Sequence, residues 1–378
     1  MKERILIAGG GIGGLTLAAL LHRRGRECLV VERSPRFAPV GAGLVIQPNA
    51  VRALRIGGIE DAILSRGSAM ERMQIRDDRG RVLSSIEGAA FRSRFSAGAF
   101  GFHRSTLHGA LAALVPDTSI RLSAQVLACG ATGEGAFVEL ADDERLEGAG
   151  LVAADGLHSV VRRGLVRDGE PRYSGYTSWR GVAARGPLWP AGQMSESWGR
   201  GARFGLVAID GERLYWFATA NASAGGRDAS REDLLRRFAG WHDPIRAVLE
   251  ATPDHMILRT DIADRDPIGK WGDGRITLLG DAAHPMTPNL GQGGGQAIED
   301  AVALDLCLSA STEVAVAFRD YESRRLERTA RVVSEARRFG RIGQLENGVA
   351  RWARDLAVRM TPKGATLGAL SWLYDFDL

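Results

Sequence analysis

The sequence predicts an α/β fold in which a parallel sheet with helices is interrupted by a mainly antiparallel sheet and followed by C-terminal helices. Two glycine-rich stretches indicate the first part, because each follows a short apolar run and opens a helical pattern. They are residues 9–14 and residues 291–295. The second part is indicated by residues 171–266, where short β-like runs separated by turns dominate and five of the eight tryptophans occur.

Length and composition limit the class of protein. The 378 residues suffice for two to three domains. An apolar fraction of 45% and a charged fraction of 25% are typical of a soluble globular chain. The net charge of +4 comes from arginines interleaved with acids, and lysine occurs only at positions 2, 270 and 363. This pattern indicates solvated helix faces and no nucleic-acid-binding stripe.

The three cysteines, Cys28, Cys129 and Cys307, lie far apart in apolar runs and form no CxxC motif. They predict buried free thiols in a reducing cytoplasm and no metal site. No run is long and apolar enough to predict a transmembrane segment.

The chain begins with the pattern of a dinucleotide-binding unit. A predicted strand is followed by G-x-G-x-x-G, a helix and a second strand that finishes at an acid. These features are residues 4–8, then Gly9, Gly11 and Gly14, a helix that ends at Gly25, residues 28–31, and Glu32. The glycines allow a tight turn and close approach of a pyrophosphate, and the acid can bind ribose hydroxyls. An adenine dinucleotide site is predicted, with FAD and NAD both open.

Residues 40–150 are predicted to contain short elements of both kinds. We expect a glycine-rich loop over 40–47, a helix from Pro48 capped by Gln47 or Asn49, two strands within 73–86, an irregular aromatic stretch over 91–102, a helix over 107–114 capped by Ser105, and strands over 120–129 and 136–140. Arg104 at the entrance of the helix is compatible with a surface role or a binding role.

Two further acids end predicted strands. The strand over 151–154 ends in Asp155-Gly156, and the strand over 276–279 ends in Gly280-Asp281. Open α/β sheets bind ligands at the carboxyl ends of their strands. The glycines at 293–295 then open a helix whose N–H groups can meet an anion or an electron-rich ring. An ordinary turn is the alternative, but three consecutive glycines are more than a turn requires.

The inserted sheet and the C-terminal helices complete the expected fold. Strands are predicted over 178–184, 195–198, 204–209 and 213–219, and helices over 233–238, 244–249, 314–339, 345–360 and 367–378. Alternation places Leu214, Trp216 and Ala218 on one face of a strand and Tyr215, Phe217 and Thr219 on the other. One face lines the pocket, and the pattern does not determine which.

Three motifs, in this order, resemble the single-component FAD-dependent aromatic hydroxylases, the group A flavoprotein monooxygenases. They are residues 9–14 with Glu32, Asp155-Gly156 in LVAADGLHSVVRR, and Gly280-Asp281 in LLGDAAHPMTPNLGQGGGQAIEDA. The resemblance covers essentially the whole chain. It implies a Rossmann-like, glutathione-reductase-type FAD-binding domain over 1–72, 101–168 and 267–340, an inserted mainly antiparallel β-sheet substrate domain over 73–100 and 169–266, and a C-terminal helical segment over 341–378.

The resemblance also implies which residues bind FAD. Arg104 would contact the phosphates and ribityl chain, Asp281 the ribityl–pyrophosphate region, and residues 293–295 the pyrimidine edge of the flavin. Asp155-Gly156 is associated with both FAD and NADPH. The full implied set is Gly9, Gly11, Gly13, Gly14, Glu32, Arg33, Arg104, Val126, Asp155, Gly156, Asp281, Pro288, Gly291, Gly293, Gly294 and Gly295.

The implied activity is an NADPH- or NADH-consuming monooxygenase. It would insert one oxygen atom from O2 into a small aromatic or heteroaromatic substrate through a flavin C4a-hydroperoxide, with the cofactor carrying the hard chemistry. The absence of a second G-x-G-x-x-G fits transient binding of NAD(P)H. Alternatives are an epoxidase or N-hydroxylase of a secondary metabolite, or a non-oxygenating flavin-bound scaffold. The chain is expected to be a monomer or a homodimer.

Candidates for substrate contact are Trp179, Arg180, Arg203, Trp216, Met286, Pro288 and Asn289. Either arginine could anchor a carboxylate or phenolate, or lie on the surface. Residues 286–289 lie between Asp281 and the glycine triplet, where substrate is expected to meet flavin. Asn289 stands where some urate-hydroxylating relatives carry an acid, which weakens a urate assignment. No residue is assigned as catalytic, and His284 is expected to be structural.

Overall fold

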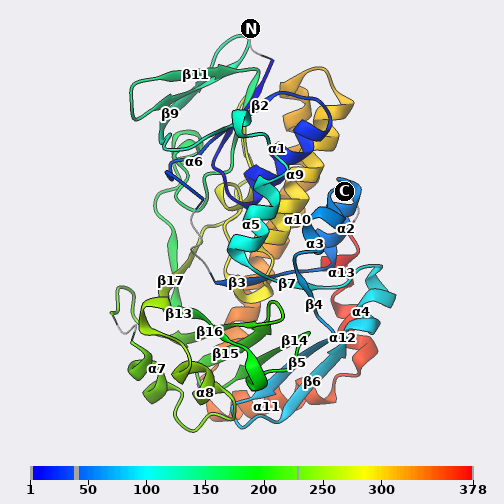
Figure 1. Cartoon of the computed structure of the whole chain (residues 1–378), viewed down its shortest axis with the longest axis vertical. Coiled ribbons are helices and arrows are strands. Elements are labelled where there is room, and N and C mark those ends of the chain that lie inside the picture. The colour runs from blue at the N-terminus through cyan, green and yellow to red at the C-terminus, as the bar shows by residue number, and fades with distance from the viewer. Residues whose placement is uncertain (1–2, 38–41, 228–229, 377–378) are drawn as a thin grey trace.

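The computed structural model describes residues 3–37, 42–227 and 230–376. One half of the molecule holds a parallel sheet and most helices, and the other half holds the large inserted sheet (Figure 1). The long helix α10 (Val314–Gly343) runs through both halves. The predicted fold class is confirmed.

The parallel sheet has the strand order β18-β12-β1-β2-β8, and every neighbouring pair is parallel. Its strands are β1 (Ile5–Ala8), β2 (Cys28–Val31), β8 (Ile120–Arg121), β12 (Gly150–Ala153) and β18 (Ile276–Leu278). β1 and β12 are buried along their whole length. Helices and a second, smaller sheet pack against these strands, and burial on both faces explains the continuous apolar runs.

Helices α1 and α9 pack beside this sheet and meet each other closely. A Cβ atom on Gly13 would lie 2.4 Å from the Leu279 Cδ2 atom and 3.2 Å from the Ala297 Cβ atom. Glycine at this position therefore allows the first turns of α1 and α9 to approach. The helices of this half are α1 (Ile12–Arg23), α2 (Pro48–Ile56), α3 (Glu60–Leu64), α5 (Arg104–Ala112), α6 (Val160–Val166) and α9 (Gly293–Ala310).

Two small antiparallel sheets complete this half. Their strand orders are β11-β10-β9 and β3-β7-β4, with β3 (Gly43–Ile46), β4 (Ser68–Ala69), β7 (Phe100–His103), β9 (Val126–Ala131), β10 (Ala136–Leu140) and β11 (Arg145–Gly148). Short 3-10 helices lie at Asp117–Ser119, Gly186–Leu188, Asp254–Met256, Gly280–Ala282 and Pro288–Leu290.

The prediction that residues 91–102 are irregular is wrong. This stretch contains most of helix α4 (Gly88–Phe95) and strand β7. β7 pairs with β3 and β4, and Phe91 and Phe95 of α4 pack on Tyr374 near the C-terminus. These partners are distant in sequence, so local pattern does not reveal them. β3 lies in the predicted glycine-rich loop, whose residues 40 and 41 fall outside the described residues.

The predicted cap of α5 is also corrected. The helix begins at Arg104, three residues earlier than predicted, and His103 is its N-cap. The His103 Nδ1 atom accepts a hydrogen bond from the Ser105 backbone N–H at 3.3 Å. Ser105 is therefore inside the first turn, and its Oγ atom lies 2.6 Å from the same ring nitrogen.

The inserted sheet has seven strands in the order β17-β13-β16-β15-β14-β5-β6. All neighbours are antiparallel except β14 and β5. The strands are β5 (Arg72–Asp77), β6 (Val82–Glu87), β13 (Arg172–Ala184), β14 (Gln193–Trp198), β15 (Ala202–Ala208), β16 (Arg213–Asn221) and β17 (Leu258–Asp264). The sequence pattern predicts no strand at β17.

The two faces of the inserted sheet have different partners. Leu214, Trp216 and Ala218 face a core closed by α7 (Arg231–Arg237) and α8 (Ile245–Glu250). Tyr215 and Phe217 belong to another cluster that includes residues before and within β3. A Cβ atom on Gly43 would lie 2.4 Å from the Tyr215 ring, so this face meets the other half of the molecule.

The C-terminal helices are α11 (Gly348–Met360), α12 (Lys363–Ala369) and α13 (Ser371–Tyr374). The Tyr374 hydroxyl contacts the Gln47 amide oxygen, and the Arg52 Nη1 atom donates to the Tyr374 carbonyl at 2.8 Å. The end of the chain is thereby joined to α2. In the described part of the chain, no helix combines the length and apolarity needed to cross a bilayer.

A buried ionic cluster joins α9, α10 and the loop after β18. One Asp300 oxygen accepts from Arg325 Nε at 2.7 Å, and the other from the Gly280 N–H at 2.9 Å and from the His284 ring at 2.6 Å. Arg325 also donates to Glu299 at 2.6 Å. Burial would raise the pKa of Asp300, but the attraction of His284 and Arg325 lowers it to about 2.

Asp300→Asn should destabilise the protein by about 3–5 kcal/mol, because Arg325 would lose a buried counter-charge. The wild-type contribution is present above pH 3.8 and is lost as the pH falls toward 2, since the folded-state pKa lies below the unfolded value. Urea unfolding between pH 7 and pH 2 measures both effects. Asp273→Asn, which breaks an exposed pair with Lys270, is the matched control and should cost less than about 1 kcal/mol. Equal losses for the two variants would contradict the assignment.

Candidate cofactor and substrate site

The three predicted motifs meet at one edge of the parallel sheet. β18, β12 and β1 are adjacent, and their registers align Ala153 with Ala8 and with Leu278. The carboxyl ends of these strands lead directly into Gly9, Asp155 and Gly280. Chain segments more than 100 residues apart therefore supply one common edge.

The turn after β1 contains glycines for two different structural reasons. Gly9 has a φ of +106°, and a Cβ atom there would lie 2.4 Å from the Ala154 carbonyl oxygen. A Cβ atom on Gly14 would lie 2.1 Å from the Gly9 carbonyl oxygen. Gly11 differs, because no protein atom lies within 4 Å of its Cβ position. Gly9 and Gly14 allow the backbone to pack on itself, whereas Gly11 borders open space that a pyrophosphate fits.

Glu32 fixes the shape of this turn. One carboxylate oxygen accepts from the Gly10 N–H and the other from the Ser34 N–H, both at 2.8 Å. Each oxygen has a further lone pair available to a ribose hydroxyl. The His108 Nε2 atom lies 2.6 Å from the Gly10 carbonyl oxygen, and burial lowers the pKa of His108. Sequence reasoning did not assign His108, because its partner is 98 residues away.

Asp155 carries an unsatisfied acceptor. Its Oδ2 atom accepts from the Val160 N–H at 2.9 Å, whereas the buried Oδ1 atom finds no partner among the described residues. Burial raises the pKa of Asp155. Next to it, Gly156 has a φ of +82° and open space at its Cβ position. A buried oxygen without a protein donor beside open space fits a ligand that supplies the donor.

Asp281, Arg104 and the start of α9 lie together. A Cβ atom on Gly293 would lie 3.8 Å from the Asp281 Oδ1 atom. The Asp281 side chain is accessible to solvent but lies deep among protein atoms, so desolvation raises its pKa while His284 and Arg104 oppose that rise. The Arg104 side chain is exposed at the start of α5. A guanidinium that has no ion pair among the described residues, a carboxylate and helix N–H groups here fit the phosphates and ribityl chain of FAD.

The loop before α9 is held by α2. The Gln47 side chain donates to the Leu290 carbonyl oxygen at 2.9 Å, and the Asn49 side chain donates to the Gln292 side chain at 2.9 Å. Gln47 occupies the N-cap position of α2, as predicted, but its side chain makes no capping hydrogen bond. Gly291, with a φ of +62°, allows the loop to turn between these contacts.

The remaining cofactor candidates occupy the borders of this region. Arg33 follows β2 and is exposed, and Val126 begins β9 and is half-buried. Pro288 is exposed on the loop, and Gly294 and Gly295 belong to the first turn of α9. The roles of these residues in FAD binding stay predictions.

On the substrate side, Asn289 is fully engaged by the protein. Its Oδ1 atom accepts from Arg203 Nη2 at 2.5 Å and from the Tyr176 hydroxyl at 3.1 Å. Its Nδ2 atom donates to Thr287 Oγ1 at 2.8 Å and to the Ala336 carbonyl oxygen at 2.9 Å. Asn289 therefore joins the loop to α10 and to the inserted sheet.

Arg203 is also committed to protein partners. Its Nη1 atom donates to Glu196 at 2.9 Å and its Nε atom to Gln344 at 3.1 Å. Only 2% of the residue is exposed. The ion pair with Glu196 balances its charge, so Arg203 positions Asn289 and does not present a free cation.

The substrate candidates Trp179, Trp216 and Arg180 lie on different faces of the inserted sheet. Trp179 and Trp216 are buried in the core beneath α7 and α8, on the face away from the flavin half, so their position favours packing. Arg180 is on the opposite face, opposite Phe217. Its Nη2 atom donates to Thr260 Oγ1 at 2.8 Å, and its buried Nε atom has no partner among the described residues. Met286 is half-buried in an apolar cluster with residues of α13.

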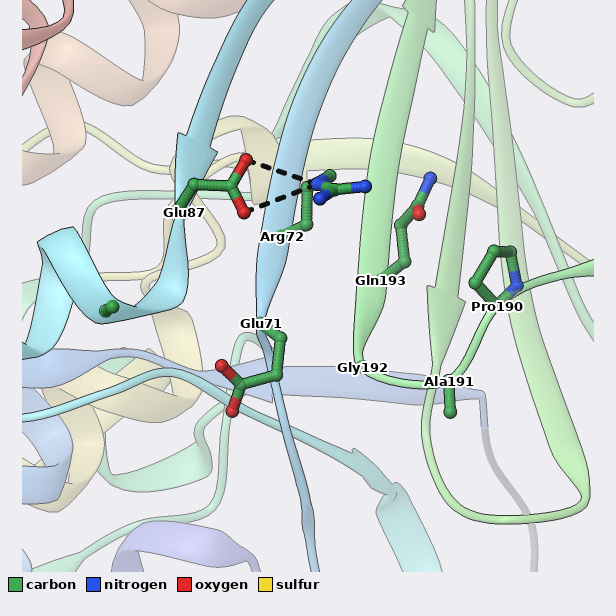
Figure 2. Close-up of a pocket in the computed structure, with 8 residues that line it drawn as sticks. Glu71, Arg72, Glu87, Pro190, Ala191, Gly192 and Gln193 are labelled. Carbon is green, nitrogen blue, oxygen red and sulfur yellow. Dashed lines mark hydrogen bonds and ion pairs between the residues drawn. The ribbon is translucent and has the colours of Figure 1, made fainter.

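A surface pocket of about 300 Å³ lies elsewhere, between β5, β6 and residues 190–193 (Figure 2). Its two central charges, Arg72 and Glu87, pair with each other at 3.2 Å, and both side chains are about half exposed. None of the residues predicted to bind cofactor or substrate lines this pocket. We assign it no part in the chemistry.

Comparison with known proteins agrees with this geometry. A relative from Stigmatella aurantiaca, "Aurachin C monooxygenase/isomerase", is 46% identical over 358 residues, which is 94% of each chain. "3-amino-4-hydroxybenzoate 2-monooxygenase" from Streptomyces cremeus is 35% identical and covers 98% of this chain and 94% of its own. The structure of Klebsiella pneumoniae HpxO complexed with FAD and uric acid matches with a TM-score of 0.92 at 29% identity, covering 98% of this chain and 97% of that one.

The fold and the site define a flavin-dependent monooxygenase that acts on aromatic or heteroaromatic compounds. The chain belongs to the FAD binding domain family, whose model matches residues 2–336. The predicted cofactor is thereby confirmed, and the alternative of a non-oxygenating scaffold is not supported.

Gly11→Ala should weaken FAD binding about tenfold while changing the unfolding free energy by less than about 0.5 kcal/mol. The φ of −77° at this residue suits alanine, and only the ligand would meet the added methyl group. Gly14→Ala should instead destabilise the apoprotein by about 1–3 kcal/mol, because the methyl group meets the Gly9 carbonyl. FAD titration and urea unfolding measure the two effects. If Gly11→Ala bound FAD as the wild type does, Gly11 would not border the pyrophosphate.

Arg104→Ala should raise the FAD dissociation constant about tenfold, because a charge-assisted hydrogen bond is worth about 1.5–3 kcal/mol. Retention of the flavin absorbance through gel filtration gives the first measure, and titration of the apoprotein gives the second. Arg66→Ala, at another exposed arginine, is the control and should retain FAD fully. Unchanged retention in Arg104→Ala would remove Arg104 from the site.

Proposed function

We propose that this monooxygenase acts on a neutral, fused heteroaromatic compound of quinolone type, with NADPH or NADH as reductant. The observation that carries the proposal is the neutralised state of Arg203, whose guanidinium pairs with Glu196 at 2.9 Å and donates to Asn289 and Gln344. An enzyme that selects an anionic substrate is expected to offer a cation free of protein counter-charge. Arg203 does not meet that condition. Arg180 pairs with no acid among the described residues and is the proposed donor to a carbonyl or hydroxyl of the substrate, so the proposal rests on Arg203 together with the apolar surroundings.

The surroundings of this pair support an apolar substrate. The sheet face that meets the flavin half carries Met73, Val182, Met194, Val207, Tyr215 and Phe217. The pKa of Tyr215 is raised to about 12 by burial, so its hydroxyl stays neutral. Aromatic and thioether side chains bind flat apolar rings by dispersion and by edge contacts. A fused heteroaromatic ring gains more from such a surface than a small carboxylate does.

The identities to the relatives support a quinolone-type substrate over a benzoate. The relative named for aurachin C is 46% identical, and the relative named for 3-amino-4-hydroxybenzoate is 35% identical. A relative named as a urate hydroxylase is 33% identical. We therefore place an aurachin-C-like compound above benzoates and urate as the substrate.

We propose the following roles for the residues of the site. When bound, FAD supplies the oxygen-transfer chemistry. Arg104, Asp281 and the glycines of α1 and α9 would hold it. Arg180, whose buried Nε atom has no partner among the described residues, is the group available to donate to a carbonyl or hydroxyl of the substrate. The apolar face would exclude water from the reacting ring.

The cysteines bear on the cellular compartment of the enzyme. Cys28, Cys129 and Cys307 are all free, and burial raises the pKa of Cys28 and of Cys129 to about 11. Thiols of this kind are stable in the reducing cytoplasm, where we propose that the enzyme works. A monomer or a homodimer is compatible with the fold.

The test is a comparison of aurachin C, 3-amino-4-hydroxybenzoate and urate as stimulators of NADPH and NADH oxidation by the FAD-loaded enzyme. Aurachin C should stimulate most, and the product should carry one atom from labelled O2. Preference for either other compound would overturn the assignment of the substrate. Consumption of NADPH with no labelled product would contradict oxygen insertion.

Glu196→Gln should shift selectivity toward anions, because it removes the charge that balances Arg203 while keeping an acceptor for it. We expect the ratio of kcat/KM for 3-amino-4-hydroxybenzoate to that for aurachin C to rise at least about fivefold. Glu212→Gln, at an exposed glutamate outside this network, is the control and should leave the ratio unchanged. An unchanged ratio in Glu196→Gln would place Arg203 away from the substrate.

A further inference from the structure

Helix α11 carries an apolar face that the protein does not cover. Val349, Trp352, Leu356 and Met360 are 76%, 66%, 37% and 73% exposed. Their spacing of three and four residues puts them on one side of the helix. Ala353 and Ala357 are exposed between them. The outer face of α11 therefore consists of apolar side chains along its 13 residues.

Two arginines of α11, Arg351 and Arg354, point the other way and pair with acids. Arg354 is buried, pairs with Asp355 at 2.8 Å and lies over the Trp198 ring at 5.0 Å. Arg351 pairs with Asp78 at 2.7 Å. A surface helix of a globular protein normally has the reverse arrangement, with its apolar stripe inward. Contiguous exposed apolar surface of this kind marks an interaction site.

Other exposed apolar side chains are scattered. In the described part of the chain, Ile56, Val82, Leu127 and Val316 are about half exposed, each on a different element. Met256 and Leu258, near the start of β17, are 43% and 38% exposed. Ile342, 37% exposed, is on the last turn of α10, which hydrogen-bonds to Arg354 of α11. The concentration of exposed apolar groups is thus specific to one end of the molecule, where α11 lies opposite the N-terminus (Figure 1).

The size of this face favours one kind of partner. A helix of 13 residues is about 20 Å long, and with a width of roughly 10 Å it presents about 200 Å². A stable protein interface buries about 800 Å² on each partner. The α11 face is too small to hold a second copy by itself. A bilayer needs no matching surface, because a single amphipathic helix can lie in the headgroup region with its apolar side chains inserted.

The charges around α11 favour an anionic bilayer. Arg359 beside Met360 and Arg341 beside Ile342 are exposed and, within the described residues, take part in no ion pair. Of the nearby acids, Asp78 and Asp355 are paired with arginines of α11, and Glu346, which precedes the helix, accepts a hydrogen bond from Asn221. Arg341 and Arg359 outnumber this one acid. A tryptophan on the apolar face suits the boundary between headgroups and acyl chains.

We propose that α11 docks this enzyme on the surface of a bilayer that contains anionic phospholipids. Val349, Trp352, Leu356 and Met360 enter the boundary between headgroups and acyl chains, and Arg341 and Arg359 contact the phosphates. The attachment is peripheral and reversible, since one short helix supplies it.

Flotation of the FAD-loaded full chain with vesicles tests the proposal. The wild type should float with phosphatidylcholine–phosphatidylglycerol vesicles, float less with phosphatidylcholine alone, and lose binding in high salt. Trp352→Glu and Met360→Glu should each lower the bound fraction about tenfold while retaining FAD, because each removes a large apolar group from the lipid. Leu127→Glu and Val316→Glu, at exposed positions elsewhere, are matched controls and should float as the wild type does.

Three outcomes would overturn the proposal. The wild type could fail to float with anionic vesicles, or Trp352→Glu could float as well as the wild type. Light scattering after gel filtration could instead show a dimer that Trp352→Glu converts to a monomer without vesicles. That last result would assign the α11 face to a second copy of the chain.

Discussion

The edge of the parallel sheet where the three motifs meet, here called the cofactor edge, depends on the carboxylate of Asp300. This carboxylate receives hydrogen bonds from the backbone of Gly280, from His284 and from Arg325, and so joins a strand end, a loop and two helices at one buried point. A buried charge must keep its partners, so these elements are fixed relative to one another. The position of Asp281 and the direction of the first turn of α9 follow from this junction.

Sequence patterns predicted the residues of the site whose roles depend on their neighbours in the chain. Gly9 and Gly14 could be predicted because the backbone itself requires glycine there, and Asp155 and Asp281 because each ends a short apolar strand. The helices α9 and α10 were predicted to within a few residues from their periodicity. Asp300 and His108 could not be assigned, because each acquires its role from a partner that only the folded chain brings near. The same reason explains why α4 and β7 were taken for an irregular stretch.

The roles of the residues near the substrate could not be assigned from local sequence patterns. Alternation divided β16 into two faces, but the contact of Tyr215 with Gly43 decides which face meets the flavin half. Arg203 resembles a free anchor in the sequence, whereas in the fold Glu196 on the neighbouring strand balances its charge. Residue type left a substrate contact and a surface role open for Arg203, and its burial and contacts indicate a positioning role instead. The resemblance to known hydroxylases fixed the chemistry without fixing the compound.

The junction between Tyr374 and Gln47 couples the C-terminal helices to the cofactor edge. Gln47 donates to the loop that precedes α9, and its amide oxygen meets the Tyr374 hydroxyl, which lies 327 residues further along the chain. The Arg52 side chain of α2 donates to the Tyr374 carbonyl oxygen at 2.8 Å and so fixes the same point from a second side. Cleavage of the chain before α13 would therefore remove a support of the loop without removing any residue predicted to bind FAD, and flavin retention would then report on a segment that lies outside the cofactor site.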